Sequence, residues 1–165
     1  ERLGQAAFVD KRTVLPNRAA QIAVIDELTR VSGTGDHVLA LIDIDLFKRI
    51  HDSHGHAAGD AVLRRFAEAG RSLRRTSDVL ARWGGGEFLL MLPATAPDAA
   101  MACVQRLHAA LSEVAFDDIA PGLVVTFSAG LAACAPADRL EAVIERSDQA
   151  MYRAKVCGRD RTGMG

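Results

Sequence analysis

Hydrophobic residues along the chain follow two alternating patterns: continuous runs, typical of buried strands, and helical spacing, typical of amphipathic helices. The continuous runs predict strands over residues 37–45 and 123–133, and a β-hairpin formed by residues 79–83 and 87–92 with glycines between its arms. The helical spacing predicts helices over residues 15–31, 46–55, 57–75, 96–114 and 139–158. Because strands and helices alternate without a linker or repeat, the pattern predicts one α/β domain with a mixed sheet.

Composition and charge narrow the class of protein. The chain has 165 residues, which is enough for one domain with a sizeable core. Its formal net charge is -1, so no overall basic field favours binding to nucleic acid, and none is expected as a partner. The three cysteines share no CxxC spacing, which favours reduced, mostly structural thiols in a cytosolic setting.

No segment of the sequence is predicted to cross a membrane, and we expect the domain to be cytoplasmic. The longest uncharged stretch, Leu123–Ala137, is too short to span a bilayer, and the N-terminus has no signal-peptide pattern. We expect residues 1–165 to form a single domain, with residues 1–9 as the end of an upstream linker helix. The abrupt start of the sequence leads us to expect a preceding sensory or membrane segment in a longer protein.

Two acidic residues end the predicted strand over residues 37–45. Asp43 and Asp45 are two positions apart, so their side chains point the same way and could flank a cation at the carboxyl end of the strand. Asp45 could instead cap the following helix, and this is the role we expect for it. We expect Asp43 to be the ligand, because a buried apolar strand has little other reason to end in an unpaired carboxylate.

Two basic residues lie near the end of the last predicted helix. Lys155 and Arg159 are predicted to be one helical turn apart. They could neutralise a polyphosphate, or they could complement the dipole at the end of the helix. Their spacing leaves both roles open.

Five separated motifs occur in order along the chain. They are DKRTVLPNR (10–18), DIDLFKRIHDSHGHAAGD (43–60), GGGEF (84–88), TFSAGLA (126–132) and SDQAMYRAKVCGRDR (147–161). Each resembles the corresponding motif of the GGDEF domain, the catalytic module of diguanylate cyclases. Because the motifs cover nearly the whole chain in the family's order, chance agreement is remote.

The resemblance implies a fold similar to the polymerase palm and the nucleotidyl cyclases, with a central five-stranded mixed sheet surrounded by helices. It also implies a reaction in which two GTP molecules condense to cyclic di-GMP and release two pyrophosphates. In the family each domain binds one GTP and two domains face each other, so a homodimer is needed for catalysis. Two Mg²⁺ ions assist the attack of a ribose 3′-hydroxyl on the α-phosphate.

The resemblance also implies roles for individual residues. Asp43 is the implied bridging metal ligand, the Ile44 carbonyl is a second, and Glu87 is the acid that remains in the hairpin as a possible third. The implied catalytic residues are Asp43, Glu87 and Lys48. The implied substrate-binding residues are Phe47, Lys48, Lys155 and Arg159 near the phosphates, His51 and Asp60 at the guanine, and Gly84 and Gly85 where the backbone approaches the nucleotide.

Two departures from the family pattern bear on catalysis. The third hairpin residue, normally an Asp or Glu that binds metal, is Gly86 in this chain. Neighbouring residues on a strand face opposite ways, so Glu87 is not expected simply to replace that ligand, and Mg²⁺ binding is expected to be weakened or absent. His51 stands where the family has the Asn that reads guanine, which is expected to weaken guanine selectivity.

Arg75 and Asp78 form an RxxD sequence that ends five residues before the glycines. This offset matches the inhibitory site of the family, which binds cyclic di-GMP. An Arg side chain offers a fork to a phosphate or to the edge of a guanine, and an Asp accepts from guanine N–H groups. The alternative is a solvated basic cluster that Arg75 forms with Arg71 and Arg74. We favour the binding site.

Three functions remain open. The favoured hypothesis is a cyclic di-GMP signalling domain whose catalysis is impaired or lost through Gly86 and whose RxxD site still binds cyclic di-GMP. The alternatives are an active diguanylate cyclase and a regulatory module that binds GTP or only dimerises. An upstream sensory domain is an expected partner in the full-length protein.

Overall fold

A five-stranded sheet forms the centre of the computed structural model, which describes residues 9–10, 15–16, 19, 22, 37–75 and 77–165. The strand order is β4-β5-β3-β6-β7, and all neighbours are antiparallel except β6 and β7, which run parallel. The sheet is therefore mixed, as the sequence predicts. The strands are β3 (His37–Ile44), β4 (Val79–Arg82), β5 (Glu87–Leu92), β6 (Phe127–Cys134) and β7 (Thr162–Met164).

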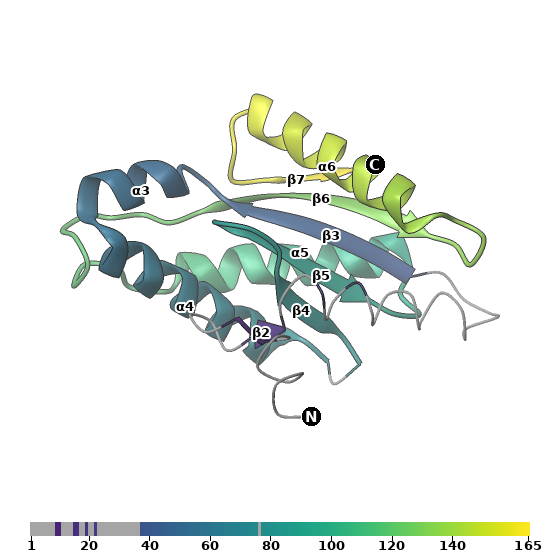
Figure 1. The fold of residues 1–165 in the computed structure, drawn as a ribbon, viewed down its shortest axis with the longest axis horizontal. Coiled ribbons are helices and arrows are strands. Elements are labelled where there is room, and N and C mark those ends of the chain that lie inside the picture. The colour runs from purple at the N-terminus through teal and green to yellow at the C-terminus, as the bar shows by residue number, and fades with distance from the viewer. Residues whose placement is uncertain (1–8, 11–14, 17–18, 20–21, 23–36, 76) are drawn as a thin grey trace.

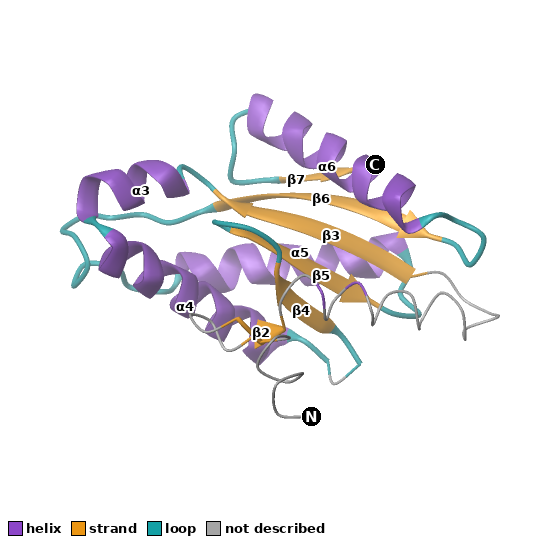
Figure 2. Ribbon diagram, in the orientation of Figure 1, coloured by secondary structure: helices purple, strands orange, loops and turns teal. Residues whose placement is uncertain are grey.

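Helices cover both faces of this sheet, as Figures 1 and 2 show. Figure 1 places α6 on one face and α4 and α5 on the other, with α3 beyond the end of β3. The helices are α3 (Phe47–His54), α4 (His56–Leu73), α5 (Pro97–Ser112) and α6 (Leu140–Val156). This is the palm-like α/β arrangement that the sequence predicts. Within the described residues, no helix is long and apolar enough to cross a membrane.

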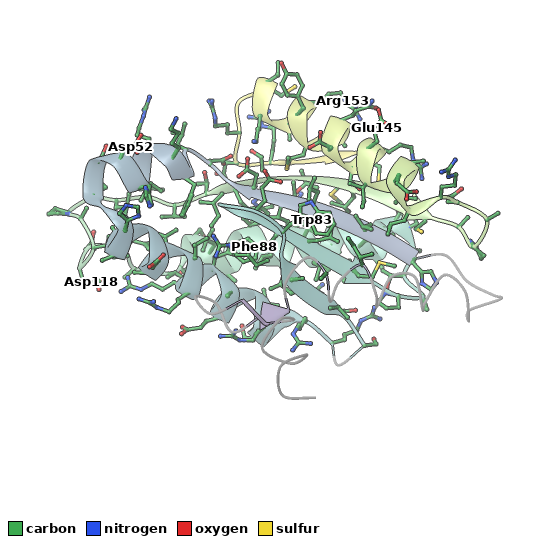
Figure 3. The ribbon with its side chains drawn as sticks, in the orientation of Figure 1. Asp52, Trp83, Phe88, Asp118, Glu145 and Arg153 are labelled. Atoms are coloured by element: carbon green, nitrogen blue, oxygen red, sulfur yellow. The ribbon has the colours of Figure 1, made fainter. Side chains whose placement is uncertain are left out.

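Alternate residues of β3 point to opposite faces of the sheet, and both faces are buried. Ile42 and Ile44 belong to the larger core, which they share with α4 and α5. Leu41 belongs to a smaller core with residues of α6. Phe88 (labelled in Figure 3) lies in the larger core, with its ring centroid 4.6 Å from that of Phe66. Because β3 is central and buried, its carboxyl end is a rigid base for the side chains that follow.

The structure confirms the predicted elements after residue 36, with small shifts at their ends. The largest shift is at β6, which begins at Phe127 although the apolar pattern starts at residue 123. Its partner strand β3 ends at Ile44, which pairs with Phe127, so the preceding residues have no ladder to join. Strand β7 is not predicted from the sequence, because its three residues carry no strand pattern and depend on β6 for pairing.

The N-terminal predictions fall mostly outside the described residues. The first two residues of the helix predicted over 15–31 instead form β2 (Leu15–Pro16), which pairs antiparallel with β1 (Val9–Asp10). That pairing places Val9 in a strand rather than in a linker helix. Ala19 and Ile22 are helical, as predicted. The remainder of that helix, residues 1–8 and most of the DKRTVLPNR motif lie outside the described residues.

Candidate functional site

The candidate site begins where β3 ends beside the β4–β5 hairpin. β3 and β5 pair with Asp43 opposite Glu87, so both carboxylates lie on the same face of the sheet. Glu87 is the first residue of β5, and the register across the sheet places it beside Asp43. The sequence of β5 alone does not show that Glu87 has Asp43 of β3 as its neighbour.

The glycine loop of the hairpin is held by its own backbone and by Arg82. The amides of Trp83 and Gly84 donate to the Glu87 carbonyl at 2.8 and 3.2 Å. Nε of Arg82 donates to the Gly84 carbonyl at 2.8 Å, and its Nη2 donates to the Gly85 carbonyl at 2.6 Å. Gly85 is exposed, and nothing lies within 4 Å of the place where its Cβ would be. The outer side of the loop is therefore open to a close approach by a ligand.

Lys155 of α6 reaches the carboxylate of Asp43. Its Nζ donates to Oδ2 of Asp43, and the two side chains are 32% and 19% exposed. Burial raises the pKa of the Asp43 carboxyl above its ordinary value, although the hydrogen bond and the charge of Lys155 oppose this rise. Asp43 is thus a partly desolvated carboxylate in a position that already attracts a cation.

Gly86 is buried against Phe47 of α3. A Cβ at residue 86 would lie 2.8 Å from both Cβ and Cγ of Phe47, closer than side chains approach one another. The Gly86 carbonyl accepts a hydrogen bond from the Ile44 amide at 2.9 Å, which fixes the backbone at this point. Phe47 therefore fills the space in which a side chain at residue 86 would begin.

His51 and Asp60 come from the neighbouring helices α3 and α4. The His51 ring centroid lies 6.2 Å from that of Phe47 and 3.9 Å from that of His56, which it meets edge-on. A Cβ on Gly59 would lie 3.0 Å from Cδ2 of His51, so the two helices pack closely here. Asp60 follows Gly59 on α4 and is half-buried. The two residues implied in guanine recognition thus flank one helix contact.

Asp45 does not cap α3, so that prediction is wrong. Leu46 is the N-cap residue of α3, and no side chain caps this helix. Asp45 is 7% exposed and accepts hydrogen bonds from Oγ1 of Thr126 and Oγ of Ser128, each at 2.7 Å, and from the Asp160 amide at 2.9 Å. Its carboxylate turns toward β6 and the C-terminal loop because three donors converge there.

Arg159 is not on the same helix as Lys155. α6 ends at Val156, and Gly158, with φ 124°, turns the chain away from the helix. Arg159 lies in the following loop with φ 64°, so the prediction that it stands one helical turn from Lys155 is wrong. Arg159 is exposed, as is Lys48 on α3.

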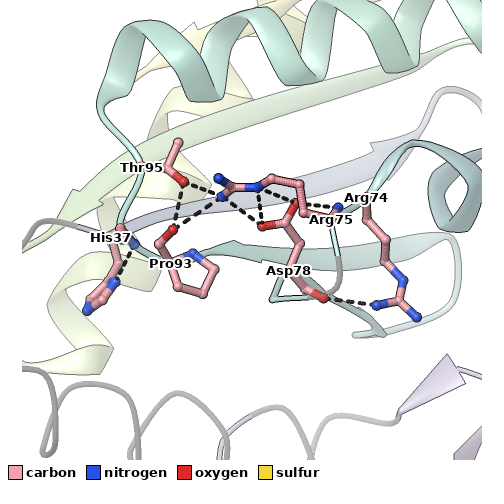
Figure 4. A network of polar contacts seen from close by, with 7 residues as sticks. His37, Arg74, Arg75, Asp78, Pro93 and Thr95 are labelled. Carbon is pink, nitrogen blue, oxygen red and sulfur yellow. Dashed lines mark hydrogen bonds and ion pairs between the residues drawn. The ribbon is translucent and has the colours of Figure 1, made fainter.

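Arg75 and Asp78 form an ion pair at the far end of the β4–β5 hairpin (Figure 4). Nη2 of Arg75 donates to Oδ1 of Asp78 at 3.0 Å, to Oγ1 of Thr95 at 2.6 Å and to the Pro93 carbonyl at 3.2 Å. The side chain of Asp78 is only 1% exposed, whereas that of Arg75 is 56% exposed. The carboxylate therefore anchors Arg75, and the guanidinium is the part of the pair that faces solvent.

A pocket of about 230 Å³ adjoins this ion pair. Arg75, Asp78, Thr95, Cys103 and Arg106 supply most of its polar lining. Arg106 comes from α5 and is not predicted from the sequence, because no motif connects it to the RxxD sequence. Only the packing of α5 on the sheet brings the second guanidinium to the pocket. Two guanidinium groups beside apolar walls suit a planar or phosphate-bearing ligand.

The Asp43 site and the Arg75 pocket lie at opposite ends of the same hairpin. The glycine loop precedes β5, and Pro93 and Thr95 follow it. At about 3.4 Å per residue, the six residues of β5 separate the two sites by roughly 20 Å. One ligand of nucleotide size does not span both.

A comparison with family models decides which domain this is. Residues 7–161 match the model described as "Diguanylate cyclase, GGDEF domain". The chain belongs to the GGDEF family. This GGDEF chain is 45% identical over 159 residues to the diguanylate cyclase DgcP of Pseudomonas aeruginosa, a match that covers 95% of this chain and 24% of DgcP. It is 40% identical over 162 residues to the response regulator PleD of Caulobacter vibrioides, covering 94% of this chain and 36% of PleD.

Solved structures of GGDEF proteins share the fold. The coiled coil and GGDEF domain of DgcB from Caulobacter crescentus, in complex with c-di-GMP, matches with a TM-score of 0.90 and 27% identity, covering 99% of this chain and 88% of that one. The diguanylate cyclase SiaD of Pseudomonas aeruginosa, in complex with its activator SiaC, matches with a TM-score of 0.90 and 34% identity, covering 99% and 64%. The GGDEF chain thus spans about a quarter of DgcP and about a third of PleD.

Proposed function

We propose that this GGDEF domain binds cyclic di-GMP in the pocket beside Arg75, and that its own synthesis of cyclic di-GMP is impaired or lost. The contact between Gly86 and Phe47 is the observation that carries the second part. Residue 86 offers no carboxylate, and the Phe47 ring fills the space beside it. The hairpin therefore supplies one acid, Glu87, where the family pattern supplies two.

The first part rests on how Arg75 is held. Asp78 and Thr95 fix the guanidinium before any ligand arrives, so little side-chain entropy is lost on binding. Arg106 lines the same pocket and adds a second positive charge. Cyclic di-GMP carries two phosphates and two guanines, and a guanidinium fork suits either a phosphate or the O6/N7 edge of guanine.

The nucleotide site retains enough groups for weaker GTP binding. Asp43, Glu87 and the Ile44 carbonyl would hold Mg²⁺, which neutralises phosphate charge, and two carboxylates on one face suit one such ion better than two. The other proposed contacts are Lys48, Lys155 and Arg159 with Phe47 at the phosphates, His51 and Asp60 at the base, and Gly84 and Gly85 along the backbone. A homodimer would bring two such sites together, and a sensory domain in a longer protein would regulate them.

A calorimetric titration with cyclic di-GMP tests the proposed pocket. We expect binding by the unmodified domain, at least tenfold weaker binding by Arg106→Ala, and a similar loss in Arg75→Ala. Arg106→Ala is the cleaner variant because it leaves the pair between Arg75 and the buried Asp78 intact. Arg71→Ala removes a neighbouring positive charge from α4 and is expected to bind normally. No heat of binding with the unmodified domain would refute the proposal.

One observation favours a second function, an active diguanylate cyclase. The register that places Glu87 opposite Asp43 keeps two carboxylates together despite the loss at residue 86. If these two acids and a water are enough to hold both metal ions, the domain synthesises cyclic di-GMP from GTP. A domain that binds GTP without turnover, or that only dimerises, would show neither synthesis nor binding in the Arg75 pocket.

A further inference from the structure

The carboxylate of Asp45 is a buried anchor for the loop that carries Arg159. It receives three hydrogen bonds, from the hydroxyls of Thr126 and Ser128 on the β6 side and from the backbone amide of Asp160. A carboxylate that is 7% exposed costs free energy unless donors satisfy it, and these three donors do so. The first two fix the carboxylate to the sheet, and the third fixes the loop to the carboxylate.

The loop held in this way has an unfavourable backbone. Gly158, Arg159 and Asp160 have φ values of 124°, 64° and 48°, so three consecutive residues are left-handed. Glycine adopts this region freely, but residues with side chains do so only where the surroundings impose it. The Asp160 amide donates to Asp45, and the Arg159 amide donates to the Ala154 carbonyl at 3.0 Å. These contacts set the direction in which the Arg159 side chain leaves the backbone.

His108 of α5 holds the same loop from the other side. Its Nδ1 lies 3.5 Å from Oδ1 of Asp160, and its Nε2 lies 2.8 Å from Oγ1 of Thr162. The ring stacks on Phe127 with centroids 3.8 Å apart and an interplanar angle of 9°. The sheet thus fixes the ring, and the ring fixes Asp160.

A cavity of about 450 Å³ lies beside this contact and is lined by His108, Thr126 and Asp160, among others. The side chain of Asp160 is 61% exposed. Packing therefore does not confine the loop on this side, and the loop has room to relax once its hydrogen bonds are lost. Polar contacts therefore hold the loop, and those with Asp45 and His108 join it to the sheet and to α5.

We propose that Asp45 and His108 are positioning residues that hold the left-handed loop at 158–160 and thereby direct Arg159 toward the nucleotide phosphates. This inference rests on the proposed nucleotide site. It gives the second aspartate of the DID sequence a role that differs from metal binding and from helix capping. It also connects α5, on one face of the sheet, to a residue that follows α6 on the other.

A double-mutant cycle on the whole domain tests this role, with the α,β-methylene analogue of GTP and Mg²⁺ as the probe. Asp45→Asn and Arg159→Ala should each weaken binding several-fold, and the double variant should bind no more weakly than Arg159→Ala alone. Lys48→Ala is the matched control, because Lys48 is also a proposed phosphate contact but lies on α3, which Asp45 does not cap. The loss of binding free energy in Lys48→Ala should add to the loss in Asp45→Asn.

Two variants of His108 separate positioning from general packing. Asn places an amide near the position of Nδ1 and can still reach Asp160, whereas Gln places its amide near Nε2 and can reach only Thr162. We expect near-normal affinity in His108→Asn and reduced affinity in His108→Gln. This pair also provides the test if Asp45→Asn does not fold.

Hydrogen exchange gives a readout that does not depend on the nucleotide. Asp45→Asn should speed exchange at the Asp160 amide and leave β3 and β5 unchanged. Unchanged exchange at Asp160, or losses in Asp45→Asn and Arg159→Ala that simply multiply, would overturn the positioning role alone. If the unmodified domain does not bind the analogue, the nucleotide site and the role of Arg159 both fail, and the cyclic di-GMP pocket is not affected by that result.

Discussion

Asp43 and Glu87 stand directly opposite each other on β3 and β5, with their carboxylates on one face of the sheet. Lys155 already donates to Asp43 from α6. The pairing keeps two carboxylates together although residue 86, a glycine, carries none. A divalent ion would therefore be bound by both strands, and both carboxylates should matter equally.

This geometry makes a prediction for metal binding. Asp43→Asn and Glu87→Gln should each weaken the binding of Mn²⁺, used as a spectroscopic substitute for Mg²⁺, by about tenfold or more, since each removes one of two charged ligands. Titration followed by electron paramagnetic resonance measures the free ion. Asp52→Asn removes an exposed carboxylate from α3 and should have no effect. Weaker Mn²⁺ binding in only one of the variants Asp43→Asn and Glu87→Gln would contradict a shared site.

An acid introduced at residue 86 should lower the stability of the folded domain. Gly86→Asp places a Cβ 2.8 Å from Phe47, so the ring must move, and overpacking of this kind costs about 1–3 kcal/mol. Urea unfolding measures the loss. Gly85→Asp is the matched control, because nothing lies within 4 Å of its Cβ position. The loss should shrink when Phe47→Ala accompanies Gly86→Asp. Equal stability of the two aspartate variants would show that Phe47 does not occupy that space.

The charge on Asp43 is predicted to destabilise the folded domain at neutral pH. Burial raises the pKa of its carboxyl, so the folded state binds a proton more readily than the unfolded state does. Its contribution to stability is therefore highest at low pH and falls as the pH rises through the folded pKa. Asp43→Asn should raise the Tm at pH 7.5, and the difference should vanish near pH 3. A lower Tm in the variant at pH 7.5 would contradict this sign.

His108 is predicted to give the opposite dependence of folding stability on pH. Burial lowers the pKa of its imidazole, although the carboxylates of Asp160 and Asp45 oppose the shift. The unfolded state therefore binds the proton more readily, so the stability from neutral His108 is present above about pH 6.5 and is lost as the pH falls. His108→Asn should flatten the dependence of unfolding free energy on pH between about 7 and 5. An unchanged slope would contradict it.

The fold could be predicted from local patterns because they agree with tertiary packing. The apolar run at 37–45 became β3, Gly55 caps the end of α3, and α6 ends at Val156, two residues before Gly158. Two of the misses depend on partners distant in the chain. β6 starts late because β3 ends at Ile44, and Asp45 turns away from α3 because Thr126 and Ser128 offer donors.

The candidate sites show the same division. Motif spacing brings Arg75 and Asp78 together as an i,i+3 pair, whereas Asp43 contacts Lys155, which lies far from it in the sequence. Spacing says nothing of Arg106, which α5 brings to the pocket, or of Phe47 over Gly86. Neither contact leaves a periodic or local signal in the sequence, and both arise only when the helices pack on the sheet.

Formation of cyclic di-GMP from GTP is the most direct test of impaired catalysis. The domain, tethered as a dimer, is incubated with GTP and Mg²⁺, and the nucleotides are separated by chromatography. We predict no cyclic di-GMP above a control without protein, because residue 86 supplies no carboxylate and Phe47 fills its place. Clear, time-dependent synthesis of cyclic di-GMP would contradict this account and would favour an active diguanylate cyclase that uses Asp43 and Glu87.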